Sequence, residues 1–109
     1  MYKNTDEQKV TLMRQDAERG DARAQRLLAL RYWRGRGVEQ SDTLAADWMH
    51  RAAAQGLSLA QRDLANFYQT GTGVLQDPRK ALTLYRAAAE QGDPIAVRCL
   101  KKLEKDKGA

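Results

Sequence analysis

The 109-residue sequence has little of what most catalytic and metal sites are built from. It contains one cysteine, Cys99, and one histidine, His50. A single cysteine excludes an internal disulfide and any zinc site built on several thiolates, and a single histidine excludes a pair of imidazole ligands. These shortages remove most classes of enzyme and metalloprotein.

Long apolar runs are also missing. The longest stretch without a charged residue, 64–76, contains Asn, Gln, Thr and Gly, whereas a membrane-spanning helix needs about 20 predominantly apolar residues. We therefore expect no membrane span. The first twenty residues alternate acidic and basic side chains, unlike a secretory signal. With a free thiol, the expected location is the cytoplasm, or the periplasm if a leader was removed.

The sequence does contain an internal repeat. A shift of 36 residues superimposes 20–55 on 56–91 with fifteen identities, and a third copy begins at Gly92. Chance does not explain this many matches at one offset, and a period of this length indicates a repeat architecture. The identical pairs begin at Gly20/Gly56, Ala24/Ala60, Gln25/Gln61, Arg26/Arg62, Leu28/Leu64, Ala29/Ala65 and Tyr32/Tyr68.

Each full copy predicts two helices. Over 21–34, Ala24, Leu28 and Tyr32 recur every four residues, and Leu27 and Leu30 widen this apolar stripe. A second helix is expected over 42–55. No segment alternates apolar and polar residues with a period of two, so strands are not expected.

Turn chemistry supports these helix boundaries. Gly35 supplies the left-handed residue that ends a helix, and Gly37 gives a second permissive turn position. Ser41 and Asp77 align as helix N-caps, and Pro78 follows at the first helical position of the second copy.

One copy cannot bury its apolar stripe alone, so the copies are expected to stack into a solenoid. We predict an all-α single domain, a right-handed α/α solenoid of about two and a half 36-residue repeats with six helices. Its parts are a half repeat at 5–19, repeats at 20–55 and 56–91, a partial repeat and cap at 92–105, and a tail at 106–109.

Two motifs carry a resemblance to a known family. One is Ala24-Gln25-x-x-Leu28-Ala29-x-x-Tyr32-x-x-Gly35-x-Gly37-Val38, and the other is Asp77-x-x-Lys80-Ala81-x-x-Leu84-Tyr85-x-Ala87-Ala88-Ala89-Glu90-Gln91-Gly92. They resemble the two halves of a Sel-one-like repeat (SLR), a relative of the tetratricopeptide repeat, over most of 10–104. Leu84 departs from the pattern because the family usually has Trp there, which we interpret as a packing substitution. The resemblance implies a helical scaffold, frequently bacterial, that binds proteins or peptides and has no catalytic residues.

No cluster of residues predicts catalysis, a cofactor or a metal. The Gly35-Arg36-Gly37-Val38 loop lacks the preceding strand and the Lys-Ser or Lys-Thr of a phosphate-binding loop. His50 is expected on a solvated helix face without a partner for general-base work. Cys99 lies on an apolar stripe and is interpreted as a small buried residue. We therefore predict no enzyme activity.

A basic surface is the remaining candidate site. Arg26, Arg62 and Arg98 recur at intervals of 36, so stacking should align them as a ladder. In tetratricopeptide-like solenoids the first helices line the concave face, where guanidinium groups can hold carboxylates. Nearby aromatic and apolar side chains can anchor a partner. The predicted partner-binding residues are Arg23, Arg26, Leu30, Arg31, Trp33, Arg34, Arg62, Asn66, Phe67, Arg98 and Lys101.

The leading hypothesis is a protein-interaction module or adaptor whose concave groove binds a peptide or protein surface, and the arginines favour an acidic one. Other interpretations stay open. The arginine stems can simply cover the core with their heads solvated, the end helices can self-associate, or the chain can be an immunity or chaperone partner of a secreted protein. Nucleic-acid binding is weaker, because the net charge of +5 is moderate and 14 acidic residues are scattered through the chain.

Overall fold

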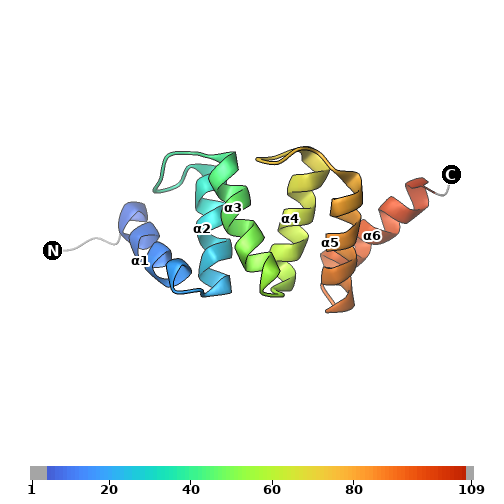
Figure 1. Ribbon diagram of the computed structural model, residues 1–109, viewed down its shortest axis with the longest axis horizontal. Coiled ribbons are helices and arrows are strands. Elements are labelled where there is room, and N and C mark those ends of the chain that lie inside the picture. The colour runs from blue at the N-terminus through green and yellow to red at the C-terminus, as the bar shows by residue number, and fades with distance from the viewer. Residues whose placement is uncertain (1–4, 108–109) are drawn as a thin grey trace.

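The computed structural model describes residues 5–107, which form six helices and no strand (Figure 1). This confirms the predicted all-α class. The last helix extends two residues beyond the predicted cap, and residues 108 and 109 of the predicted tail lie outside the described residues. The helices are α1 (Asp6–Glu18), α2 (Ala22–Arg34), α3 (Asp42–Ala54), α4 (Ser58–Thr70), α5 (Pro78–Glu90) and α6 (Pro94–Lys107).

The helices follow one another along the long axis of the molecule (Figure 1). Each packs mainly on its neighbours in the sequence, and the principal-axis extents are 59 × 24 × 21 Å. The radius of gyration is 14.9 Å, above the roughly 13 Å of a compact domain of about 100 residues. The chain is therefore an elongated solenoid, as predicted. Within the described residues, no helix is long and apolar enough to cross a bilayer.

The predicted caps determine where the helices begin and end. The hydroxyl of Ser41 accepts a hydrogen bond from the backbone N–H of Leu44, and the carboxylate of Asp77 accepts two at the start of α5. Gly35 and Gly71 end α2 and α4 in the left-handed conformation, with φ of 66° and 75°. Only glycine adopts this conformation without steric cost.

The second glycine of each long loop touches the preceding helical hairpin. Gly37 and Gly73 have φ of 83° and 67°. A Cβ on Gly37 would lie 2.6 Å from the backbone oxygen of Asp6 in α1, and one on Gly73 would clash with the equivalent oxygen of Asp42 in α3. The Gly-x-Gly spacing therefore supplies both a turn and a point of close packing between copies.

Small side chains make up most of the core. Alanines on every helix are buried, and the largest fully buried side chains are Tyr85, Leu28, Met49 and Val10. Such residues allow helix axes to approach at the short end of the usual 8–10 Å range. Leu27 differs from the prediction because 44% of it is exposed, so the buried stripe of α2 is narrower than its sequence indicates.

Repeated glutamines join the end of each copy to its beginning. The Nε2 of Gln55 donates hydrogen bonds of 2.9 Å to the backbone oxygen of Gly20 and to Oε1 of Gln25. Gln91 makes the same two bonds, at the same lengths, one copy later. These bonds satisfy polar groups at the turns between helices, where free backbone carbonyls gather.

Candidate functional site

The predicted arginine ladder takes part in ion pairs within the molecule. Arg26 of α2 bonds Asp63 of α4 at 2.7 Å, and Arg62 lies 3.4 Å from the carboxylates of both Asp63 and Asp93. The side chains of Arg26 and Arg62 are less than one-fifth exposed. Arg98, in α6, is exposed and forms no ion pair within the described part of the chain. Two of the three repeated arginines therefore hold the first helices of the copies together. We had expected their guanidinium groups to be free to bind carboxylates of a partner.

Asp63 is the residue that the sequence analysis missed. The residues at the same repeat position are Leu27 and Cys99, so the second copy alone places a carboxylate between the arginines of α2 and α4. Asp93 completes the row, because its Oδ1 caps α6 while its buried Oδ2 faces Arg62. A carboxylate at an otherwise apolar repeat position was the available signal.

Other predicted cations gather around the first turn of α1. Arg31 and Arg36 contact the carboxylate of Asp6 at 2.9 and 3.2 Å. These hydrogen bonds, from Arg31 first and then Arg36, lower the pKa of Asp6. The exposed residues Arg23 and Arg34 form no ion pair among the residues described. They are the free cations of α2.

Of the two predicted aromatic anchors, one reaches the surface. Trp33 is 41% exposed, but Phe67 is only 4% exposed and its ring centroid lies 6.3 Å from that of Trp33. Phe67 therefore supports Trp33 from within the fold, which corrects its expected role as an anchor. Leu30 is half-buried against the core, whereas Asn66 and Lys101 are exposed on α4 and α6.

Two hollows share the exposed side chain of Leu27. One, of about 410 Å³, lies between the start of α2 and the turn into α4. The other, of about 160 Å³, lies between α1 and α2. Arginines and apolar side chains line both, and no Asp or Glu does among the described residues. The lining residues are Arg23, Arg26, Leu27, Leu57, Ser58 and Leu59 in the first hollow, and Met13, Leu27, Leu30, Arg31, Arg34 and Arg36 in the second.

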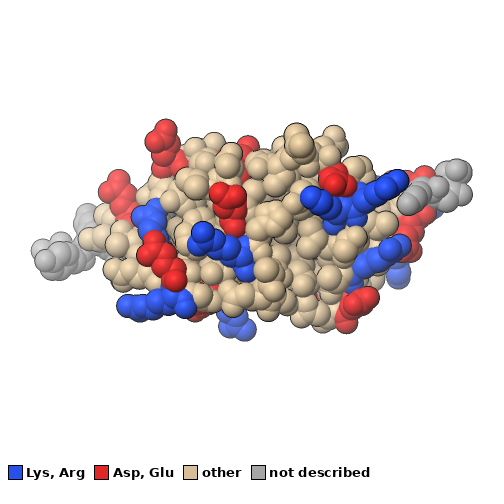
Figure 2. Space-filling view, viewed as in Figure 1, with Lys and Arg blue, Asp and Glu red and all other residues tan. Residues whose placement is uncertain are grey.

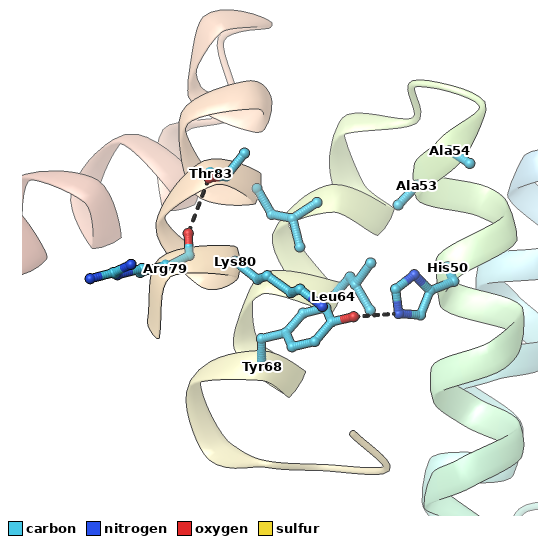
Figure 3. Close-up of a pocket in the computed structure, with 9 residues that line it drawn as sticks. His50, Ala53, Ala54, Leu64, Tyr68, Arg79, Lys80 and Thr83 are labelled. Atoms are coloured by element: carbon cyan, nitrogen blue, oxygen red, sulfur yellow. Dashed lines mark hydrogen bonds between the residues drawn. The ribbon is translucent and has the colours of Figure 1, made fainter. Parts of the chain in front are cut away.

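A third hollow, of about 470 Å³, lies between α3 and α5 with α4 at its base (Figure 3). His50 from α3 bonds the hydroxyl of Tyr68 from α4 at 2.8 Å, and the two rings meet edge to face. His50 is exposed as predicted, but it has a partner, contrary to our expectation. Burial, followed by the charge of Lys80, lowers its pKa, and Asp47 acts in the opposite direction.

No arrangement for metal chemistry appears in the part of the chain that the structure describes. Its His, Cys, Asp and Glu side chains form no group of three or more that could hold an ion. Cys99 is half-buried, in agreement with its interpretation as a packing residue.

Six helices stacked as consecutive hairpins, with Gly-x-Gly loops that pack on the preceding hairpin, define a helical-repeat solenoid. The Sel1 repeat family model matches residues 22–57 and 58–93, which is more than half of the sequence. The chain therefore belongs to the Sel1 repeat family, as its motifs indicated. Proteins of this family are generally protein-interaction modules on a non-catalytic scaffold.

Solved structures agree with this assignment. A Sel1 repeat protein from Oxalobacter formigenes is 38% identical with a TM-score of 0.86, over 90% of this chain and 74% of that one. The protein c5321, a protective antigen present in uropathogenic Escherichia coli strains, is 33% identical with a TM-score of 0.89, over 94% of this chain and 22% of that one.

Helicobacter pylori cysteine rich protein B shares the fold, with a TM-score of 0.80 at 20% identity over 84% of this chain and 68% of that one. No match is found among curated proteins. The comparisons thus establish the family and the fold of this chain.

Proposed function

We propose that the chain is a protein-interaction module that binds an acidic segment with apolar side chains along α2 and the start of α4. The observation that carries this proposal is the pair of hollows around Leu27, whose apolar surface is bordered by Arg23 and Arg34, which form no ion pair among the described residues. The other lining arginines are already paired with Asp63 or Asp6. Arginine grips carboxylates in a two-pronged geometry, and exposed apolar side chains such as Trp33 supply the anchors that dominate interfaces.

The charge distribution supports a protein partner more than a nucleic acid. On the face seen in Figure 2, basic and acidic side chains are interspersed, with broad uncharged areas between them. A nucleic-acid surface needs a continuous row of cations, because each neutralised phosphate contributes separately to affinity. A concave groove along the first helices stays a prediction, and with it the contributions of Asn66, Arg98 and Lys101.

The experiment reverses the charge of Arg23 and Arg34, which form no ion pair, and leaves the ion-paired arginines unchanged. Peptides are selected from a random display library on the immobilised protein, and their affinities are measured by fluorescence anisotropy. We expect the selected peptides to combine Asp or Glu with apolar residues. The double variant Arg23→Glu, Arg34→Glu should weaken their binding roughly ten-fold, because two attractive contacts become repulsive.

A matched control makes the same change in net charge elsewhere. Lys102→Glu with Lys105→Glu alters two exposed side chains of α6, and it should leave the affinity unchanged. Equal losses in the two double variants would show a general charge effect and contradict the proposed surface. Salt-dependent binding of random DNA at physiological ionic strength, lost in the Arg23/Arg34 variant, would assign the surface to nucleic acid.

A further inference from the structure

The third hollow lies on the other side of α4 from the exposed residue Asn66. Successive residues of a helix are 100° apart, so Leu64 and Tyr68, which line the hollow, point away from the side that carries Asn66. In Figure 3, His50, Ala53 and Ala54 come from α3, and Lys80 and Thr83 face them from α5. The third hollow also shares no lining residue with the arginine-lined hollows of α2, so it is a separate site.

The internal repeat shows why this hollow is open. The position of Leu84 in the second copy is that of Trp48 in the first. Trp48 packs against the buried cluster around Val10, Ala17 and Leu28, in the space between α1 and α3. Leu84 occupies the equivalent place between α3 and α5, where it lines a volume of about 470 Å³.

At two further positions, the side chains that line the space between α3 and α5 are shorter than their equivalents in the first space. Glu18 and Arg14 of α1 correspond to Ala54 and His50 of α3, and the latter two line the hollow. Shorter side chains thus coincide with the missing indole. The volume falls in the range of about 300–1,000 Å³ that is usual for ligand pockets, and the equivalent space of the same molecule holds an indole.

The charge at the rim of the hollow indicates which polar group a ligand would carry next to its apolar part. Lys80 Nζ lies 5.3 Å from the centre of the Tyr68 ring, and in Figure 3 its side chain extends across the hollow toward that ring. Among the described residues, neither Lys80 nor Arg79 has an ion-pair partner, and no Asp or Glu lines the hollow. A ligand with one negative charge next to its apolar group complements this rim.

We propose that this hollow docks an aromatic side chain, best a tryptophan, from a partner segment that carries an acidic residue next to it. The ring takes the place that Trp48 fills in the first copy, against Leu64, Leu84 and the Tyr68 ring. The neighbouring carboxylate meets Lys80. Aromatic side chains in apolar pockets are typical interface anchors, and ring pairs add to the energy of burial.

The test uses three short peptides. The probe is acetyl-Gly-Trp-Glu-Gly-amide, and its two analogues carry Gln in place of Glu or Leu in place of Trp. Each is titrated into isotope-labelled protein while the methyl signals of Ala53, Ala54, Leu64 and Leu84 are followed by NMR. We expect the Leu analogue to bind about three- to ten-fold more weakly, and the Gln analogue about two- to five-fold more weakly.

Two variants locate the binding. Leu84→Trp fills the hollow with the side chain of the first copy, and it should weaken the probe at least ten-fold. Leu75→Trp is its control, because it adds the same residue to a loop position that is 90% exposed, and it should bind normally. Lys80→Gln should make the Glu and Gln peptides equivalent. If Leu84→Trp loses its helical circular dichroism, Ala54→Glu replaces it and should repel the probe.

Several results would overturn the proposal. These are an absence of shifts at the four methyl-bearing residues, equal binding of the Trp and Leu peptides, or normal binding by Leu84→Trp and Ala54→Glu. A concentration-dependent dimer that Leu84→Trp abolishes, measured by sedimentation, would assign the hollow to a second copy of the chain. The Arg23→Glu, Arg34→Glu variant should bind the probe normally, so this result and that for the α2 surface can be told apart.

Discussion

The space between α1 and α3 and the space between α3 and α5 are framed by equivalent helices, but different side chains fill them. Between α1 and α3, Trp48 packs against the neighbouring copy and Arg51 stacks on its ring at 4.4 Å. Between α3 and α5, Leu84 and Ala87 hold these positions, and a hollow remains beside Leu84. The first space has its hollow, of about 480 Å³, farther toward the loop at residues 38–41 and not beside Trp48. The glycines that form the turns recur in both copies, whereas some N-cap residues and a few side chains on the walls differ. A repeat scaffold can therefore vary its surface without altering its framework.

The largest effect is expected from a change to that shared framework. Gly73→Ala combines left-handed strain with a clash against the backbone of α3, and it should lower the free energy of unfolding by about 3 kcal/mol. Gly56→Ala is the matched control, since it has φ of 89° and nothing within 4 Å of the added Cβ, so strain alone should cost about 1–2 kcal/mol. Urea unfolding followed by circular dichroism measures both. Equal losses would mean that the loop does not rest on α3.

A smaller effect is expected from exchanging the contents of the two spaces. Trp48→Leu gives the first space the residue of the second and removes buried aromatic surface, so it should cost about 2 kcal/mol. Leu84→Trp should change stability by less than about 1 kcal/mol, because the space for the ring already exists. Thermal and urea unfolding of the two variants test this asymmetry. A cost for Leu84→Trp equal to that for Trp48→Leu would show that the hollow cannot hold an indole.

The framework could be predicted because its signals are local. Gly35 is needed where the backbone is left-handed, Ser41 and Asp77 cap the next residues along the chain, and apolar side chains recur every three or four positions. Each of these requirements is met within a few residues. The period of 36 then carries the local solution from copy to copy, and the six helices follow.

The contacts of the charged side chains could not be predicted in the same way. The ladder of Arg26, Arg62 and Arg98 follows from the period, but its neutralisation depends on Asp63, which is 37 residues from Arg26. Whether two such groups meet is decided by the distance between helices and by the direction of long side chains. The departure at Leu84 was visible in the sequence, yet its consequence appears only where α3, α4 and α5 border an open hollow.

The smallest effect concerns the pKa of His50, which lies in the space between α3 and α5. In the space between α1 and α3 the equivalent residue is Arg14, which donates a 2.6 Å hydrogen bond to Tyr32 and stays charged. Burial lowers the pKa of His50 from its usual 6.5, and Lys80 lowers it further, while Asp47 raises it. Lys80→Gln should therefore raise the pKa of His50, and Asp47→Asn should lower it. An NMR titration of the imidazole protons measures both shifts.

The lowered pKa of His50 also determines how the stability of the fold changes with pH. Because the pKa of His50 is lower in the folded than in the unfolded chain, stability is complete above pH 6.5 and is lost as the pH falls through the folded value. His50→Gln keeps a group that can bond Tyr68 but removes the titration, so its stability relative to the wild type should rise between pH 7 and pH 5. Arg14→Gln, the matched change in the first space, should show no such trend. A parallel decline of wild type and His50→Gln would mean that His50 titrates as it does in the unfolded chain.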